Sequence, residues 1–206
     1  MLKHLFSCPI WKVSPNIPID VKEKLLDQIL QNFDKNKNYT HPYWGCKVYS
    51  TYSDHNNVDY SELVPYLKKE YEVFADEIEL KVHDYKIDSI WHNLYQKGSN
   101  QECHDHIGPE NFSLYSGIYF LKVNRNHPNL VFHNPSLSYT YANAYEKSQE
   151  IYSYNNPKHS SMFNKFLLKP SENDFLIFPS YLSHSVEIQK IDDIRITISL
   201  NFVLNQ

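Results

Sequence analysis

The sequence predicts a mainly β protein, in which two supporting helices precede a core of two packed β-sheets. Apolar residues recur at helical spacing within the first 80 residues. From residue 82 onward, several short segments alternate in the manner of strands. Helices followed by a run of strands favour a double-sheet core behind a helical layer. No repeat or low-complexity linker divides the chain, so we expect one domain over 1–206, with mainly helical support over 1–81 and the β core over 82–206.

The first helix is predicted in the segment VKEKLLDQILQNF, residues 21–33, where apolar side chains fall on one face and Asp20 is a plausible N-cap. An extended opening over 5–13 precedes it. The second helix is expected from about Tyr60 to Leu80. Pro65 falls in its first turns, where proline is tolerated.

The strand predictions begin with KIDSIWHNLYQKG, residues 86–98, which alternates and ends in a Lys-Gly turn. Further strands are expected at residues 114–123, 130–134, 165–170, 174–180, 183–189 and 195–204. Residues 135–162 are polar and have no clear period. A loop of that length is usually a functional lid or a disordered insertion, and we take it as a candidate lid.

Composition narrows the class of protein. The formal net charge is −4 and the pI is near 6.2, so no basic field indicates nucleic-acid binding. The apolar runs are too short for a membrane span and the N-terminus lacks the pattern of a secretory signal, so we expect a cytoplasmic protein with no membrane partner. The three cysteines are scattered and form no Cys-x-x-Cys pair, which argues against a disulfide framework and a structural zinc site.

The segment QECHDHIGP, residues 101–109, raises the question of a metal site. If residues 102–106 are extended, His104 and His106 point to one face and Asp105 points to the other. Two imidazoles on one strand face form a chelating pair. The alternative is a surface loop with solvated histidines.

The C-terminal part supplies further polar residues in a regular order. His184 follows an apolar strand and a Pro-Ser turn, and Arg195 comes eleven residues later. A buried arginine needs an anionic partner, and its planar guanidinium suits a carboxylate held by two hydrogen bonds. Thr197 shares the face of Arg195 on the alternating segment RITISLNF and can add a hydroxyl hydrogen bond.

This order of motifs resembles that of the 2-oxoglutarate/Fe(II)-dependent dioxygenase superfamily. Its members carry a His-x-Asp/Glu pair, a distal His, and an Arg-x-Ser/Thr about ten residues beyond it. The chain is more specifically similar to a phage-type 2OG-Fe(II) oxygenase subfamily, in the segments WHNLYQKGSNQECHDH, SGIYFLKV, LVFHNP, FLIFPSYLSHSVE and RITISLNF. The resemblance covers roughly residues 85–203.

The resemblance implies a double-stranded β-helix, which is a cupin-like jelly roll, with iron bound in its mouth. His104 and His184 correspond to the two histidine ligands. His106 stands where the wider family has a carboxylate, and Asp105 or Glu102 is the alternative third ligand if the strand is bulged. Fe(II) oxygenases commonly use two histidines and one carboxylate on one face of the metal.

The same resemblance implies 2-oxoglutarate as cosubstrate and O2 as oxidant. Arg195 corresponds to the residue that pairs with the distal carboxylate of 2-oxoglutarate, and Thr197 to its hydroxyl helper. Tyr95 and Tyr119 lie where related enzymes often place tyrosines that contact the cosubstrate. Packing in the core is the alternative role for both tyrosines.

The implied activity is hydroxylation of an unknown substrate, coupled to release of succinate and CO2. A peptide or protein side chain and a small molecule are both compatible substrates, and the acidic charge argues against a nucleic acid. One alternative is a cupin-like dioxygenase that uses three histidines without 2-oxoglutarate, which leaves Arg195 without a task. Another is a non-catalytic jelly-roll binding or phage structural module, which leaves the three histidines unexplained.

Overall fold

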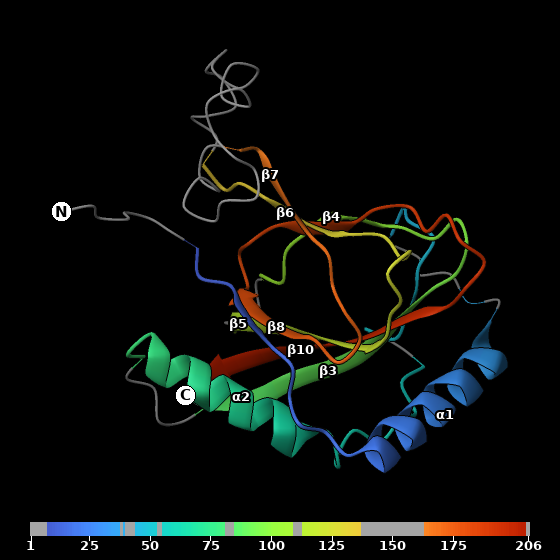
Figure 1. The fold of residues 1–206 in the computed structure, drawn as a ribbon, viewed down its shortest axis with the longest axis horizontal. Coiled ribbons are helices and arrows are strands. Elements are labelled where there is room, and N and C mark those ends of the chain that lie inside the picture. Colours follow the sequence, from blue (N-terminus) through green and yellow to red (C-terminus); the bar gives the residue numbers. More distant parts are fainter. Residues whose placement is uncertain are drawn as a thin grey trace.

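The computed structural model describes residues 8–37, 39, 44–52, 55–80, 85–108, 113–136 and 163–204 (Figure 1). Residues 5–7 of the predicted extended segment (5–13) and residues 137–162 of the predicted lid (135–162) lie outside the described residues.

The described strands form two antiparallel sheets that face each other (Figure 1). The larger sheet has the order β1-β8-β5-β10-β3-β2 and the smaller sheet the order β4-β9-β6-β7. The strands of the larger sheet are β1 (Trp11–Val13), β2 (Tyr49–Ser50), β3 (Tyr85–Tyr95), β5 (Ser113–Lys122), β8 (Phe175–Pro179) and β10 (Arg195–Leu204). Those of the smaller sheet are β4 (Gln101–His104), β6 (Leu130–His133), β7 (Lys165–Leu168) and β9 (His184–Val186). The predicted fold class, a double-stranded β-helix with N-terminal helices, is therefore confirmed.

Both helices lie against the larger sheet, on its side away from the smaller sheet (Figure 1). Helix α1 spans Ile19–Asn36 and α2 spans Val64–Glu77. The predicted N-cap Asp20 is wrong, because Pro18 occupies the cap with an extended ψ of 146° and Asp20 lies in the first turn. There its negative charge complements the helix dipole. Helix α2 is shorter than expected, with Pro65 at its start as predicted.

The N-terminal region also contributes strands. β1 pairs with β8 and β2 pairs with β3, so both edges of the larger sheet come from the part of the chain for which mainly helices were expected. Within the described residues, no helix combines the length and the apolar character needed to cross a lipid bilayer.

Strand β10 separates two apolar layers. Ile196, Ile198 and Leu200 point to the helices and pack with apolar residues of α1 and α2. The alternate side chains point into the space between the sheets, and they are the polar residues Arg195, Thr197, Ser199 and Asn201. A second apolar cluster, which includes Phe120, Phe132 and Phe178, fills the part of this space that the polar residues leave. The fold therefore brings the polar face of β10 to the interior of the double sheet.

We expect Gly117→Ala to destabilise the protein by about 1–3 kcal/mol, the usual penalty for overpacking a core. Gly117 lies in β5, and a Cβ there would come within 2.7 Å of Cε2 of the buried Phe175. Urea denaturation followed by circular dichroism measures the change. Leu114→Ala on the same strand is the control, because that side chain is 42% exposed and its loss should change stability by less than about 0.5 kcal/mol. Equal stability of Gly117→Ala and the parent protein would contradict the packing argument.

Candidate functional site

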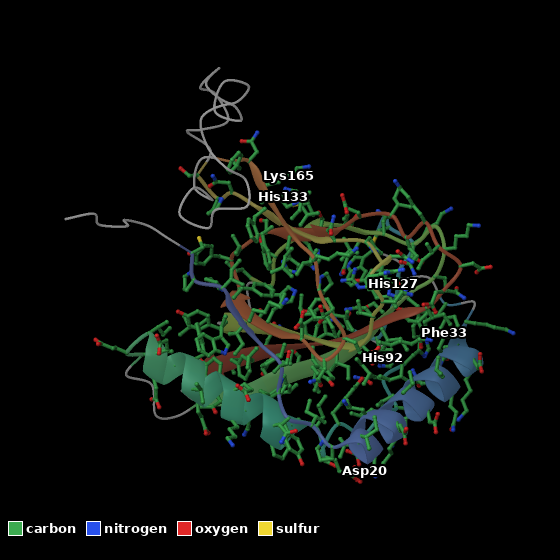
Figure 2. All side chains as sticks on the ribbon, viewed as in Figure 1. Asp20, Phe33, His92, His127, His133 and Lys165 are labelled. Atoms are coloured by element: carbon green, nitrogen blue, oxygen red, sulfur yellow. The ribbon has the colours of Figure 1, made fainter. Side chains whose placement is uncertain are left out.

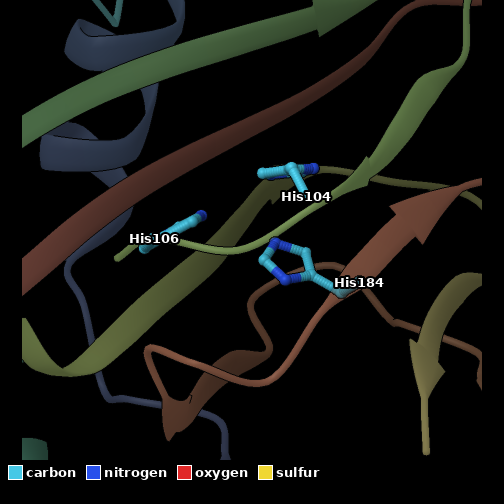
Figure 3. A group of neighbouring side chains, drawn as sticks. All are labelled: His104, His106 and His184. Atoms are coloured by element: carbon cyan, nitrogen blue, oxygen red, sulfur yellow. The ribbon is translucent and has the colours of Figure 1, made fainter. Parts of the chain in front are cut away.

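Three histidines converge between the sheets (Figure 3). His104 at the end of β4 lies opposite His184 of β9 in the antiparallel register. His106 follows two residues later, and its backbone N–H donates to the carbonyl of Ser180 at 2.9 Å. One ring nitrogen from each histidine lies within 4.8 Å of the other two. The strand pairing thus assembles three nitrogen donors at the spacing of a metal site.

A bulge in β4 decides which side chains face this cluster. Gln101 pairs with Val186 and His104 with His184, so β4 has one more residue than β9 between the paired positions. Because of this extra residue, Gln101 and His104 both face the cavity, although they are three apart in sequence. The bulge precedes His104, and the alternation from His104 to His106 is kept.

The structure accordingly brings His106, and not Asp105, to the other two histidines. Asp105 is exposed at the edge of the cavity, and its Oδ1 accepts a hydrogen bond from the backbone N–H of Ile107 at 3.1 Å. The alternation of side chains along an extended strand predicted that His104 and His106 point to the same side, and the structure has this arrangement. That these side chains bind iron stays a prediction.

Each of the three imidazoles has an oxygen acceptor beside Nδ1. The partners are the carbonyl of Glu102 for His104 at 2.8 Å, Oδ1 of Asn201 for His106 at 2.9 Å, and the carbonyl of Leu182 for His184 at 3.1 Å. An oxygen acceptor assigns the proton to Nδ1, so Nε2 keeps the lone pair that would bind a metal. Nε2 of His104 also lies 3.4 Å from the amide nitrogen of Gln101, a long and weak contact. Burial lowers the pKa of His104 and of His184, and it lowers the pKa of His106 to about 3. Neutral imidazoles are the form that binds a metal.

Asn201 is itself held by a polar network. Its Oδ1 accepts from the hydroxyl of Ser116 at 2.9 Å, and its Nδ2 donates to the hydroxyl of Ser89 at 3.2 Å. Ser116 in turn contacts Ser180, whose hydroxyl lies 2.8 Å away. Because both ends of the amide have partners, its oxygen is held toward Nδ1 of His106. The alternation of RITISLNF puts Asn201 on the same face as Arg195 and Thr197, but its contact with His106 required the tertiary structure.

Arg195 is a buried cation with an unused donor. Its side chain is 1% exposed and its guanidinium lies near the rings of Tyr95 and Phe120, at 5.1 and 5.3 Å from their centroids. One terminal nitrogen donates to the carbonyl of Pro128 at 2.9 Å, and Nε has no partner. Burial lowers the pKa of Arg195 to about 10, so the group is still charged at neutral pH.

A buried charge without a counter-ion is costly, and a carboxylate is the natural partner of a guanidinium. Among the described residues, no carboxylate forms an ion pair with Arg195. Arg195 and the three histidines line one cavity of about 150 Å³. The donor set therefore fits a divalent metal at one point of the cavity and a carboxylate at another.

The cosubstrate residues expected from the sequence divide into two groups. Thr197 and Tyr95 line the cavity, and their contact with the cosubstrate stays a prediction. The hydroxyl of Tyr95 donates to Oε1 of Gln101 at 2.5 Å. Tyr119 does not line it. Tyr119 points to the helices from the opposite face of β5, and its hydroxyl donates to Asn173 at 2.8 Å. The placement of Tyr119 at the cosubstrate is therefore wrong, and core packing is its role.

Several lining residues were missed, among them Gln101, Asn93 and Ser199. Gln101 faces the cavity only because of the bulge, so no sequence pattern could have placed it there. Asn93 of β3 lies opposite Thr197 of β10, and its Nδ2 donates to the hydroxyl of Ser199 at 3.3 Å. Both side chains line the cavity, and the alternation of the two strands could have identified them. Oδ1 of Asn93 is buried and has no partner, which leaves an acceptor free in the cavity.

Other described histidines lie outside the cluster. His92 lies on the helix-facing side of β3 (Figure 2), where its Nδ1 is 2.7 Å from the hydroxyl of Tyr60 and burial lowers its pKa to about 4. His127 lies 3.3 Å from Asp193, and His133 lies 3.0 Å from the hydroxyl of Ser185. Their partners are those of structural histidines.

Known structures share the fold. The prolyl-4-hydroxylase of Pseudomonas putida matches with a TM-score of 0.58 at 10% identity, over 96% of this chain and 93% of its own. The viral collagen prolyl hydroxylase of Paramecium bursaria Chlorella virus-1, in complex with 2-oxoglutarate, has a TM-score of 0.57 at 12% identity over 96% of both chains. HygX of Streptomyces hygroscopicus, with nickel, 2-oxoglutarate and hygromycin B bound, has a TM-score of 0.57 at 8% identity, over 95% of this chain and 83% of its own.

A comparison with curated proteins finds no significant sequence match. One protein family, described as "Putative 2OG-Fe(II) oxygenase", matches residues 89–201. This description does not mention phages, so the phage-type association stays a prediction. The match spans more than half of the chain and includes the three clustered histidines and Arg195. The chain therefore belongs to the 2OG-Fe(II) oxygenase family.

Proposed function

We propose that the protein is an Fe(II)- and 2-oxoglutarate-dependent hydroxylase. One observation carries this proposal: a buried arginine with an unpaired N–H lines the same cavity as three neutral imidazoles. A three-histidine dioxygenase that does not use 2-oxoglutarate would need the histidines alone. A non-catalytic jelly roll would need neither the three histidines nor the buried arginine. In such a protein, a buried unpaired charge would only lower the stability of the fold.

His104, His106 and His184 would hold Fe(II) through their Nε2 atoms. Fe(II), 2-oxoglutarate and O2 together supply the oxidation of a substrate C–H bond, coupled to conversion of 2-oxoglutarate into succinate and CO2.

The remaining residues that line the cavity would bind the cosubstrate and exclude water. Arg195 would pair with the distal carboxylate, with its own position fixed by the carbonyl of Pro128 and by the neighbouring rings. Thr197 would add a hydroxyl donor beside it. Apolar side chains of Ile118, Leu130 and Val186 line the same cavity and exclude water.

Anaerobically purified protein tests the proposal directly. It should bind Fe(II) and, without any prime substrate, convert 2-oxoglutarate slowly into succinate. Absence of bound metal would favour the non-catalytic module. Metal binding without 2-oxoglutarate binding in calorimetry would favour the dioxygenase that uses three histidines alone.

The ligand set is tested by alanine variants in titrations with Mn(II), an air-stable probe for Fe(II). His106→Ala should lose most metal affinity, whereas Asp105→Ala should keep it, because Asp105 is exposed and lies outside the cluster. His106→Asp restores the commoner ligand type and should preserve binding in part, since its shorter side chain reaches the metal less well. If Asp105→Ala lost Mn(II) affinity and His106→Ala kept it, the third ligand would be Asp105.

Asn201→Leu should weaken Mn(II) binding about 10- to 100-fold, the usual cost of losing a hydrogen bond that orients a metal ligand. The reason is that His106 loses its Nδ1 acceptor and is free to change tautomer and ring angle. Asn201→Asp keeps the acceptor and should retain most of the affinity. Ser199→Ala is the control, because Ser199 lies on the same face of β10 and its hydroxyl accepts from Nδ2 of Asn93 rather than contacting a histidine. Equal affinities in Asn201→Leu and Ser199→Ala would remove Asn201 from the site.

Arg195→Ala should raise the dissociation constant for 2-oxoglutarate far more than it changes Mn(II) affinity. Losing a buried charged partner costs about 2–5 kcal/mol, which corresponds to roughly 30- to 5000-fold in affinity. Arg195→Lys should rescue only in part, because an ammonium does not reproduce the two-pronged guanidinium. Arg125→Ala, at an exposed arginine, is the matched control for calorimetry with the metal present. Unchanged 2-oxoglutarate binding in Arg195→Ala would refute the cosubstrate assignment.

A further inference from the structure

Three aromatic side chains form one wall of the cavity, and the binding of metal and 2-oxoglutarate uses none of them. They are Trp44, Tyr52 and Trp91. The rings of Trp44 and Tyr52 are nearly parallel with centroids 6.5 Å apart, and Tyr52 meets Trp91 edge-on at 4.8 Å. Tyr52 is 42% exposed and Trp91 is buried. This aromatic wall therefore runs from solvent to the interior.

The aromatic wall lies beside the histidines and away from Arg195. Trp44 lies 6.4 Å from His104, and Trp91 lies 5.4 Å from His106, measured between ring centroids. Arg195 pairs with Tyr95 in the sheet, and Trp91 is four residues earlier on β3, which corresponds to about 13 Å along the strand. A group resting on the rings would therefore lie next to the metal-binding end and leave the carboxylate end free.

The charges around the wall favour a cation. Of the described residues that line the cavity, Arg195 is the cationic one, and it lies at the far end. Asp105 is the acidic one, and it lies exposed at the edge, between the two histidines that the wall flanks. Glu102 adds a second carboxylate close to Gly45, which follows Trp44 in the chain, with Oε2 3.2 Å from where a Cβ on Gly45 would lie. Aromatic faces carry partial negative charge and attract cations.

The loaded metal site would not oppose such a cation. Three neutral imidazoles contribute no charge, so Fe(II), the two carboxylates of 2-oxoglutarate and the Arg195 guanidinium sum to one positive charge. The carboxylate of Asp105, which lines the same cavity, balances it. An anionic substrate, by contrast, would meet aromatic faces and Asp105 without a cationic partner, which is unfavourable in a partly buried site.

We propose that the prime substrate presents a cationic nitrogen, as a protonated or quaternary ammonium group, to the wall formed by Trp44, Tyr52 and Trp91, with Asp105 as counter-charge. This inference rests on the proposed function for the role of the bound group as substrate, but the binding itself needs no metal. The C–H groups attached to the nitrogen lie on the rings, which places the neighbouring carbons beside the histidines.

The test compares three probes of one shape: choline, the neutral 3,3-dimethylbutan-1-ol and the anionic 3,3-dimethylbutanoate. Titrations of the full chain are followed by NMR at the indole N–H groups, with metal-free protein and with protein loaded with Mn(II) and 2-oxoglutarate. Choline should bind about tenfold more tightly than the alcohol, which is the range of a cation–π contact. Equal binding of choline and the alcohol, or tighter binding of the anion, overturns the proposal.

Variants locate the binding. Tyr52→Leu and Trp44→Leu should reduce the preference for choline over the alcohol to near unity. Asp105→Asn keeps the shape of an exposed side chain and should weaken choline alone, so the test holds even if an aromatic variant unfolds. Tyr181→Leu is the control, because Tyr181 is a 48% exposed tyrosine that does not line the cavity. An unchanged choline preference in Asp105→Asn and Tyr52→Leu would overturn the assignment.

The two proposals fail separately. If choline fails to bind while Mn(II) and 2-oxoglutarate bind, the hydroxylase proposal stands and the substrate class is wrong. If choline binds the wall while 2-oxoglutarate does not bind the metal-loaded protein, the cationic subsite stands and the proposed reaction is wrong.

Discussion

Strand β10 is buried on both faces, and this constraint organises the protein. Its apolar side chains pack against the two helices, while Arg195, Thr197, Ser199 and Asn201 are buried between the sheets. Burying four polar side chains on one face of a strand costs stability unless each forms hydrogen bonds or ion pairs. Asn201 is hydrogen-bonded to His106 and to Ser116. Arg195 donates to the carbonyl of Pro128, but its Nε–H has no partner. The polar face of one strand thus becomes the floor of a cavity.

The smaller sheet completes the site by a second constraint, the pairing of β4 with β9. Antiparallel register sets His104 against His184, and a one-residue bulge turns Gln101 inward without disturbing the step from His104 to His106. Oxygen acceptors at all three Nδ1 atoms leave Nε2 available to a metal, and burial keeps the rings neutral. Imidazole nitrogens that are already oriented and uncharged are in the form that binds a metal.

The cavity that results has two chemically different ends. At one end a buried guanidinium needs an anion, and at the other end aromatic faces and Asp105 disfavour one. The histidines lie beside the aromatic end. A cosubstrate with a carboxylate and a substrate without one can therefore occupy the same cavity without competing for the same groups.

The sequence by itself determined the elements and much of the site. Helical and period-two patterns located both helices and most of the strands, but not β2, because burial on one face leaves its period in the sequence of an element of several residues. The alternation in RITISLNF separated Arg195 and Thr197 from the apolar face, and His-x-His spacing placed two imidazoles together. These features are local, so a short stretch of sequence contains them.

Only the tertiary structure decided the features that depend on partners distant in the chain. Strand β5 is apolar on both faces, so no polar alternation marks which way Tyr119 points, and its packing against the helices followed from the sheet order. The inward turn of Gln101 depends on an extra residue opposite β9, and the acceptor for His106 comes from Asn201, 95 residues later. Trp44 and Tyr52 come from irregular segments, where no period constrains the direction of a side chain. Sequence patterns record which face of an element is buried, whereas the identity of the neighbour across the interior is set by how the two sheets and the helices pack.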